Sequence, residues 1–132
     1  MKALVFVVLA ALALSGCAVA SADRQCKAAV KEGLLNPETL EWRDFRAVDR
    51  EEFVARMFAL SRQRTGYEGE IPQSMVEEHS ARFGRVYDGI AEGGALYGVR
   101  VRAEGRLGNT VTQEQLCIVN DDGCVCEDMS SL

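Results

Sequence analysis

The chain has 132 residues, of which 48% are hydrophobic, and it carries 15 Lys and Arg side chains against 20 Asp and Glu. This length allows one compact domain, and no repeat, low-complexity tract or Pro/Gly-rich linker divides it. The net charge of −5 argues against a nucleic-acid partner, since phosphates require basic patches, and against charge-driven binding to anionic lipid.

The first 17 residues are typical of an export signal. Lys2 is followed by an apolar run from Ala3 to Leu14, shorter than the roughly 20 residues that a membrane-spanning helix needs. The segment Leu14-Ser15-Gly16-Cys17 resembles the lipobox of bacterial prolipoproteins. This resemblance, confined to the first 17 residues, implies cleavage before Cys17. The Cys17 sulfur would then carry diacylglycerol, and its amine would usually carry a further acyl chain such as palmitate.

The lipobox divides the chain into a signal peptide (1–16), a lipidated N-terminus with a short linker (17–22) and one domain (23–132). Ala18 stands where the lipoprotein sorting rule reads Asp as inner-membrane retention, so the resemblance implies an outer-membrane anchor facing the periplasm. An alternative cleavage after Ala22, in Ala20-Ser21-Ala22, fits ordinary signal peptidase and would release a soluble periplasmic or secreted protein. Both cleavages predict export.

The domain is predicted to begin with a helix from Asp23 to Leu35. Its apolar face would contain Cys26, Ala29, Val30, Gly33 and Leu34. Asn36-Pro37 ends this helix. A strand follows from Thr39 to Val48, and its alternation breaks near Asp44-Phe45, which favours a β-bulge.

Two further helices are predicted in the middle of the chain. Asp49 and Glu52 have capping-box spacing and open the first, before a loop from Arg62 to Ile71. Ser74 and Glu77 repeat that spacing after Pro72 and open the second, which Gly93-Gly94 ends. Seven side chains of the second helix share an arc of about 120° at helical pitch: Met75, Val76, His79, Phe83, Val86, Tyr87 and Ile90.

Two strands, Leu96 to Ala103 and Thr110 to Val119, are predicted around a turn at Gly105 to Asn109. The element order predicts an α+β fold with an N-terminal helix, one strand, two amphipathic helices and a C-terminal antiparallel meander, stapled by disulfides. The segment Leu35 to Thr39, with the later alternation from Tyr97 to Ala103, is similar to small secreted bacterial proteins of undefined role. That similarity implies no function.

Four cysteines remain besides Cys17, and an even number in an oxidising compartment predicts two disulfides. If Asp121-Asp122 forms a two-residue turn, Cys117 faces Cys126 across a hairpin. Cys124 then shares their face and can reach Cys26. We therefore expect Cys117–Cys126 with Cys26–Cys124. The alternative joins Cys26 to Cys117 and leaves Cys124–Cys126 as a tight ring, and a one-residue slip in the turn would favour it.

The sequence contains no recognisable catalytic constellation. His79 is the only histidine, and we expect it at the rim of the core, although a hydrolase built around it with two carboxylates is one alternative. Cys117, Cys124 and Cys126 could bind a soft metal if they were reduced, which is a second alternative. Trp42 and Tyr67 are aromatic side chains that could line a ligand surface. For Trp42, packing in the core is the favoured prediction.

These observations predict a non-enzymatic envelope lipoprotein without a cofactor or bound metal. It would contact the membrane through the anchor on Cys17 and act as a binding or structural module, with an envelope protein as a partner.

Overall fold

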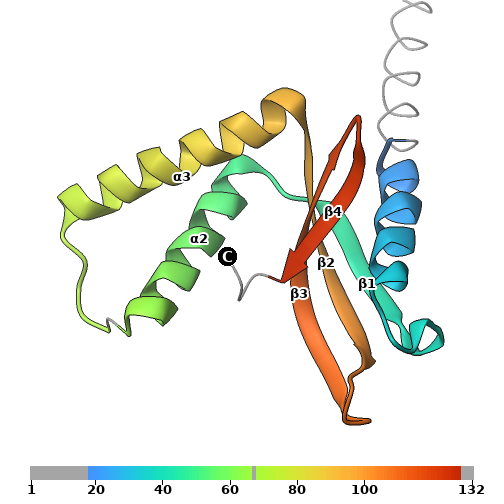
Figure 1. Cartoon of the computed structure of the whole chain (residues 1–132). Coiled ribbons are helices and arrows are strands. Elements are labelled where there is room, and N and C mark those ends of the chain that lie inside the picture. Colours follow the sequence, from blue (N-terminus) through green and yellow to red (C-terminus); the bar gives the residue numbers. More distant parts are fainter. Residues whose placement is uncertain (1–17, 67, 129–132) are drawn as a thin grey trace, which may run out of the picture.

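An N-terminal helix, a four-stranded sheet and a helical hairpin make up the structure, a computed structural model that describes residues 18–66 and 68–128 (Figure 1). The predicted signal peptide, Cys17 and Tyr67 lie outside these residues. The N-terminal helix is described over residues 18–32. The elements after it are η1 (Pro37–Thr39), β1 (Glu41–Ala47), α2 (Arg50–Thr65), α3 (Gln73–Gly93), β2 (Gly94–Glu104), β3 (Thr110–Asn120) and β4 (Gly123–Asp128).

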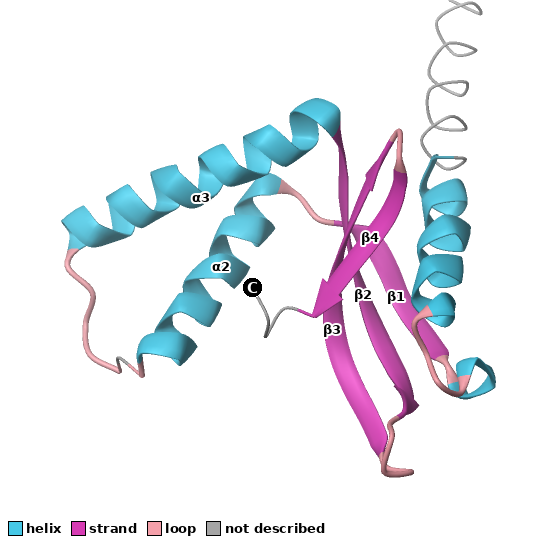
Figure 2. Ribbon diagram, in the orientation of Figure 1, coloured by secondary structure: helices cyan, strands magenta, loops and turns pink. Residues whose placement is uncertain are grey.

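The four strands pair in chain order, β1-β2-β3-β4, and every neighbouring pair is antiparallel (Figure 2). This arrangement confirms the predicted α+β class with its C-terminal meander. Side chains alternate along β2, so that Tyr97, Val99 and Val101 belong to one core, while Leu96 belongs to a second. The sheet therefore separates two cores.

The N-terminal helix packs on the first face of the sheet. Ala22 and Cys26 of the helix are buried in one cluster with Tyr97, Val99 and Cys117. The helix begins earlier than the predicted Asp23, because residues 18–22 are already helical. The small residues that predict a cleavage zone here also allow the helix to pack closely on the sheet.

The predicted bulge in β1 is present and determines which aromatic rings reach this core. The register with β2 shifts between Arg43 and Arg46, and Asp44 has a positive φ of 58°. Because the bulge adds one residue, Trp42 and Phe45 can both pack against the first core. The Phe45 ring stacks on Trp42 and Tyr97 with centroid separations of 5.8 and 4.9 Å.

Helices α2 and α3 form an antiparallel hairpin on the other face of the sheet (Figure 1). The second core contains Val48, Phe53, Leu96 and Leu116. The Tyr87 hydroxyl of α3 donates to the Val48 carbonyl at 3.0 Å, which ties the hairpin to the end of β1. No helix within residues 18–66 and 68–128 has the length and apolar character needed to cross a membrane.

The helix ends differ in part from the predictions. Asp49 caps α2 as predicted, because its side chain accepts from the Glu52 backbone N–H at 2.8 Å. The predicted loop from Arg62 is wrong, since α2 continues to Thr65 and ends at Gly66 in the left-handed conformation. The predicted Ser74 cap is also wrong. Helix α3 begins at Gln73 behind Pro72, with no side-chain cap, so Ser74 already lies in its first turn.

The predicted apolar arc of α3 is only partly covered. Phe83 is buried, whereas Met75 and Val86 have exposed fractions of 47% and 48%. A single neighbouring helix and one sheet face cannot cover an arc that runs along the whole of a 21-residue helix. The uncovered parts of the arc line two clefts.

Candidate functional site

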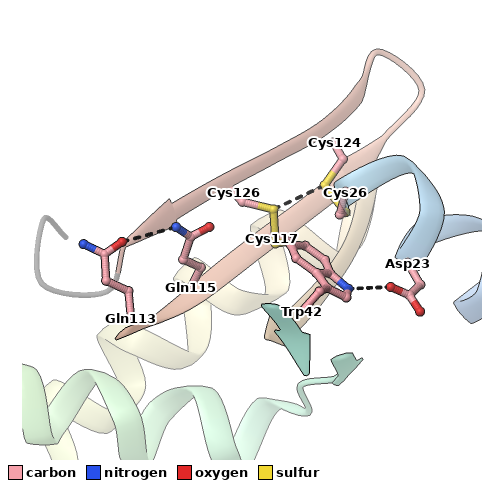
Figure 3. The surroundings of a disulfide bond; sticks show 8 residues. All are labelled: Asp23, Cys26, Trp42, Gln113, Gln115, Cys117, Cys124 and Cys126. Atoms are coloured by element: carbon pink, nitrogen blue, oxygen red, sulfur yellow. Dashed lines mark hydrogen bonds between the residues drawn. A yellow bond between two sulfur atoms is a disulfide. The ribbon is translucent and has the colours of Figure 1, made fainter. Parts of the chain in front are cut away.

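The four domain cysteines form two disulfides beside the N-terminal helix (Figure 3). Cys117 lies opposite Cys126 in the β3–β4 register, and Asn120 lies opposite Gly123 across the Asp121-Asp122 turn. Cys26 bonds to Cys124, which shares a sheet face with Cys117 and Cys126. The structure thus confirms the predicted pairing, and the alternative pairing is absent. The turn fixes this result, because a slip of one residue would turn the cysteine side chains to the other face.

The two disulfides lie against each other in a partly buried cluster. Cys26 and Cys117 are fully buried, and the Cys124 and Cys126 sulfurs are 3.7 Å apart. All four sulfur atoms lie within 4.8 Å of one another. Thiolates around a tetrahedral zinc, with Zn–S bonds of about 2.3 Å, would lie about 3.8 Å apart. The oxidised cluster offers no thiolate to a metal, since each sulfur is bonded to another sulfur.

Beside this cluster, Trp42 is held in place by a specific hydrogen bond. Its indole Nε1–H donates to the Asp23 carboxylate at 2.6 Å, as Figure 3 shows. Its ring packs against the first core, as predicted, instead of lining a ligand cleft. Trp42 and Asp23 therefore contribute to holding the N-terminal helix on the sheet.

The first cleft, the interhelical cleft, lies between the C-terminal half of α2 and the N-terminal end of α3. Its volume is about 510 Å³, within the usual range for small-molecule sites. The lining side chains are mostly apolar or hydroxyl-bearing: Phe58, Ser61, Arg62, Thr65, Ile71, Pro72, Met75 and His79.

His79 lies in this interhelical cleft, half-buried at the edge of the helical core. Its ring contacts Phe58 and Phe83 at centroid separations of 6.0 and 5.9 Å. The hydrolase alternative needs two carboxylates beside His79. Among the residues that the structure describes, the lining of this cleft contains no carboxylate.

The second cleft lies between the helical hairpin and the β3–β4 end of the sheet. It has a volume of about 200 Å³ and contains Met57, Val86 and Val125, together with Glu127 at its edge. Val125 is 62% exposed on the outer strand of the sheet. This cleft borders the second core, because Phe53, Leu96 and Leu116 also line it.

A network of arginine–carboxylate pairs covers the open part of the second sheet face. Five arginines each lie within 4.0 Å of a carboxylate: Arg43, Arg46, Arg56, Arg100 and Arg102. The hydrogen bond from Arg46 holds the pKa of the Glu52 carboxyl below its usual range, and it raises the pKa of Arg46. Exposed pairs of this kind contribute little stability individually. The network keeps this face solvated and leaves each of these arginines with a partner.

No known protein family, no characterised protein and no solved structure matches this chain. Sequence reasoning located the cysteine cluster and His79, but it missed the interhelical cleft. The available signal was Ile71-Pro72, an apolar pair in the loop just before the exposed Met75.

The disulfides generate the first prediction, which concerns stability. Replacing Cys26 and Cys124 together by Ala should lower the free energy of unfolding by about 2–5 kcal/mol. The matched double variant, Cys117→Ala with Cys126→Ala, should lose less free energy of unfolding. The Cys117–Cys126 disulfide closes a loop of 9 residues, whereas Cys26–Cys124 closes one of 98. Denaturant unfolding of both double variants measures the difference, and equal or reversed losses would contradict this account. Thiol titration of the unfolded, unreduced protein should find all four cysteines blocked.

Proposed function

We propose that the protein is an exported, lipid-anchored and non-catalytic binding module of the bacterial envelope, with Cys17 as its acylated N-terminus. The lipobox-like Leu14-Ser15-Gly16-Cys17 supports the anchor. The observation that carries the proposal is the burial of Ala22, which is 3% exposed in the first core. Two or more acyl chains on Cys17 would hold such a domain stably at a membrane.

The burial of Ala22 supports one of the two cleavage sites over the other. Cleavage after Ala22 would remove Ala22 and Val19, which pack against the first core, and leave Asp23 as the first residue. Cleavage before Cys17 keeps every described residue of the N-terminal helix. Deleting packed atoms leaves a cavity that costs stability, and this cost supports the cut before Cys17.

The anchor would also orient the domain. The beginning of the N-terminal helix lies at the same end of the molecule as the β3–β4 turn, and Gln25 approaches Gly123 there (Figure 1). The interhelical cleft lies on the opposite side of the sheet. Since the helix is described from residue 18, the acylated Cys17 would directly precede it. The domain would sit against the leaflet, and the cleft would face away from it.

Ala18 in place of Asp favours the outer membrane as the destination. The Asp121-Asp122 turn at the anchored end is acidic, so it gives no charge attraction to anionic headgroups. The lipid anchor itself would supply the membrane contact.

A second candidate function, soft-metal or thiol chemistry, is favoured by the four sulfurs within 4.8 Å. It requires free thiols in the exported protein, because disulfide sulfurs do not coordinate zinc as thiolates. The thiol titration described above separates the two functions.

The anchor is tested with a pair of signal-region variants. Cys17→Ser should abolish incorporation of labelled palmitate and stop normal processing, since the acylated sulfur is lost. Ala20→Leu is the matched control: it blocks the Ala-x-Ala site through an exposed position of the helix. Its lipid labelling and processing should match the wild type.

The opposite pattern would reject the lipid anchor. In that pattern, Cys17→Ser is processed normally, the wild type carries no lipid, and processing of Ala20→Leu is blocked. These results would assign the cut after Ala22 and a soluble protein.

A further inference from the structure

We propose that the interhelical cleft binds a single long-chain carboxylic acid, with the alkyl chain between α2 and α3 and the carboxylate at Arg62 and His79. This inference rests on the proposed role as a binding module, but it does not depend on the lipid anchor.

The walls of the cleft suit an alkyl chain. Its apolar lining comes from Phe58 of α2, from Ile71 and Pro72 in the loop before α3, and from Met75 in the first turn of α3. Phe58 is itself held by a neighbouring ring of the helical core, since it meets Phe83 edge-on at 5.6 Å. Met75 is 47% exposed although it belongs to the apolar arc of α3, so a ligand would bury surface that the fold leaves open. A flexible thioether side chain also adapts to an unbranched chain.

The charges around the cleft select the headgroup. Arg62 and His79 are the only ionisable side chains in its described lining. The chain as a whole has 20 acidic and 15 basic side chains, so a lining with cationic character and no carboxylate runs against the overall composition. An acidic headgroup would be attracted to this lining, and a cationic one would be repelled.

Arg62 is held in place yet retains donors for a ligand. One Nη2–H of Arg62 donates to the Gly69 carbonyl at 3.0 Å. The guanidinium has five N–H donors in a planar fork, so the remaining donors can bind a carboxylate. The Thr65 hydroxyl already donates to backbone carbonyls of α2, at 3.0 Å from Ser61. The Thr65 hydroxyl hydrogen is therefore already used within α2, and Arg62 is left as the donor for the carboxylate.

The shape of the cleft favours one small amphiphile over a peptide helix. A groove for an amphipathic helix has to accept anchors over two or more helical turns. A cleft of about 510 Å³ is instead of the size that encloses a small molecule. The second cleft is smaller and has Glu127 in its lining, so it should reject the same anion.

The two clefts provide an internal control, because each contains one methionine. The exported, oxidised protein, labelled with ¹³C at the methionine methyl groups and held in phosphatidylcholine nanodiscs, is titrated with dodecanoate, and empty discs correct for partitioning. We expect a saturable shift of the Met75 methyl signal, while Met57 in the second cleft stays unchanged. Dodecanol and dodecyltrimethylammonium test the headgroup, and both should bind at least about tenfold more weakly.

The charged contact is tested by Arg62→Gln, which should weaken dodecanoate binding by about tenfold. Arg64→Gln is the matched control, because Arg64 lies on the same exposed end of α2 but outside the cleft, and it should bind as the wild type does. Three results would each overturn the proposal: no saturable Met75 shift, equal shifts of Met57 and Met75, or dodecanol binding as tightly as dodecanoate. A protein that lacks acylation but passes these tests would refute the anchor alone.

Discussion

The Cys26–Cys124 disulfide joins the first described helix to β4 across 98 residues of sequence. Without this bond the N-terminal helix would be held on the sheet by a few apolar contacts and the Trp42–Asp23 hydrogen bond. With it, the helix, the bulged edge strand and the final hairpin enclose one core. The second disulfide fixes the hairpin register that points Cys124 toward the helix.

The two faces of the sheet consequently have different roles. The first is sealed by a covalently attached helix and buries Tyr97, Val99 and Val101. The second is covered only in part by the α2–α3 hairpin and carries the ion-pair network where the hairpin does not reach. The interhelical cleft lies on the hairpin side of the sheet, while the proposed anchor lies on the sealed side.

Sequence reasoning succeeded where local rules determine the outcome. Alternation located the sheet, the break at Asp44-Phe45 marked the bulge, and counting across Asp121-Asp122 gave the disulfide pairing. It failed at residues 18–22, whose small side chains fit both a cleavage zone and a packed helix, and at Arg62 to Thr65, where no apolar side chain signals that α2 continues. The interhelical cleft could not be predicted, because it depends on how two helices sit relative to each other.

The N-terminal helix packs in the first core of the domain, and we propose that processing at Cys17 preserves it. Intact-mass spectrometry of the exported protein tests this most directly. The account predicts a chain beginning at Cys17, heavier by its acyl groups and lighter by the hydrogens lost in forming two disulfides. A mass corresponding to a chain that begins at Asp23, without added hydrocarbon, would contradict it.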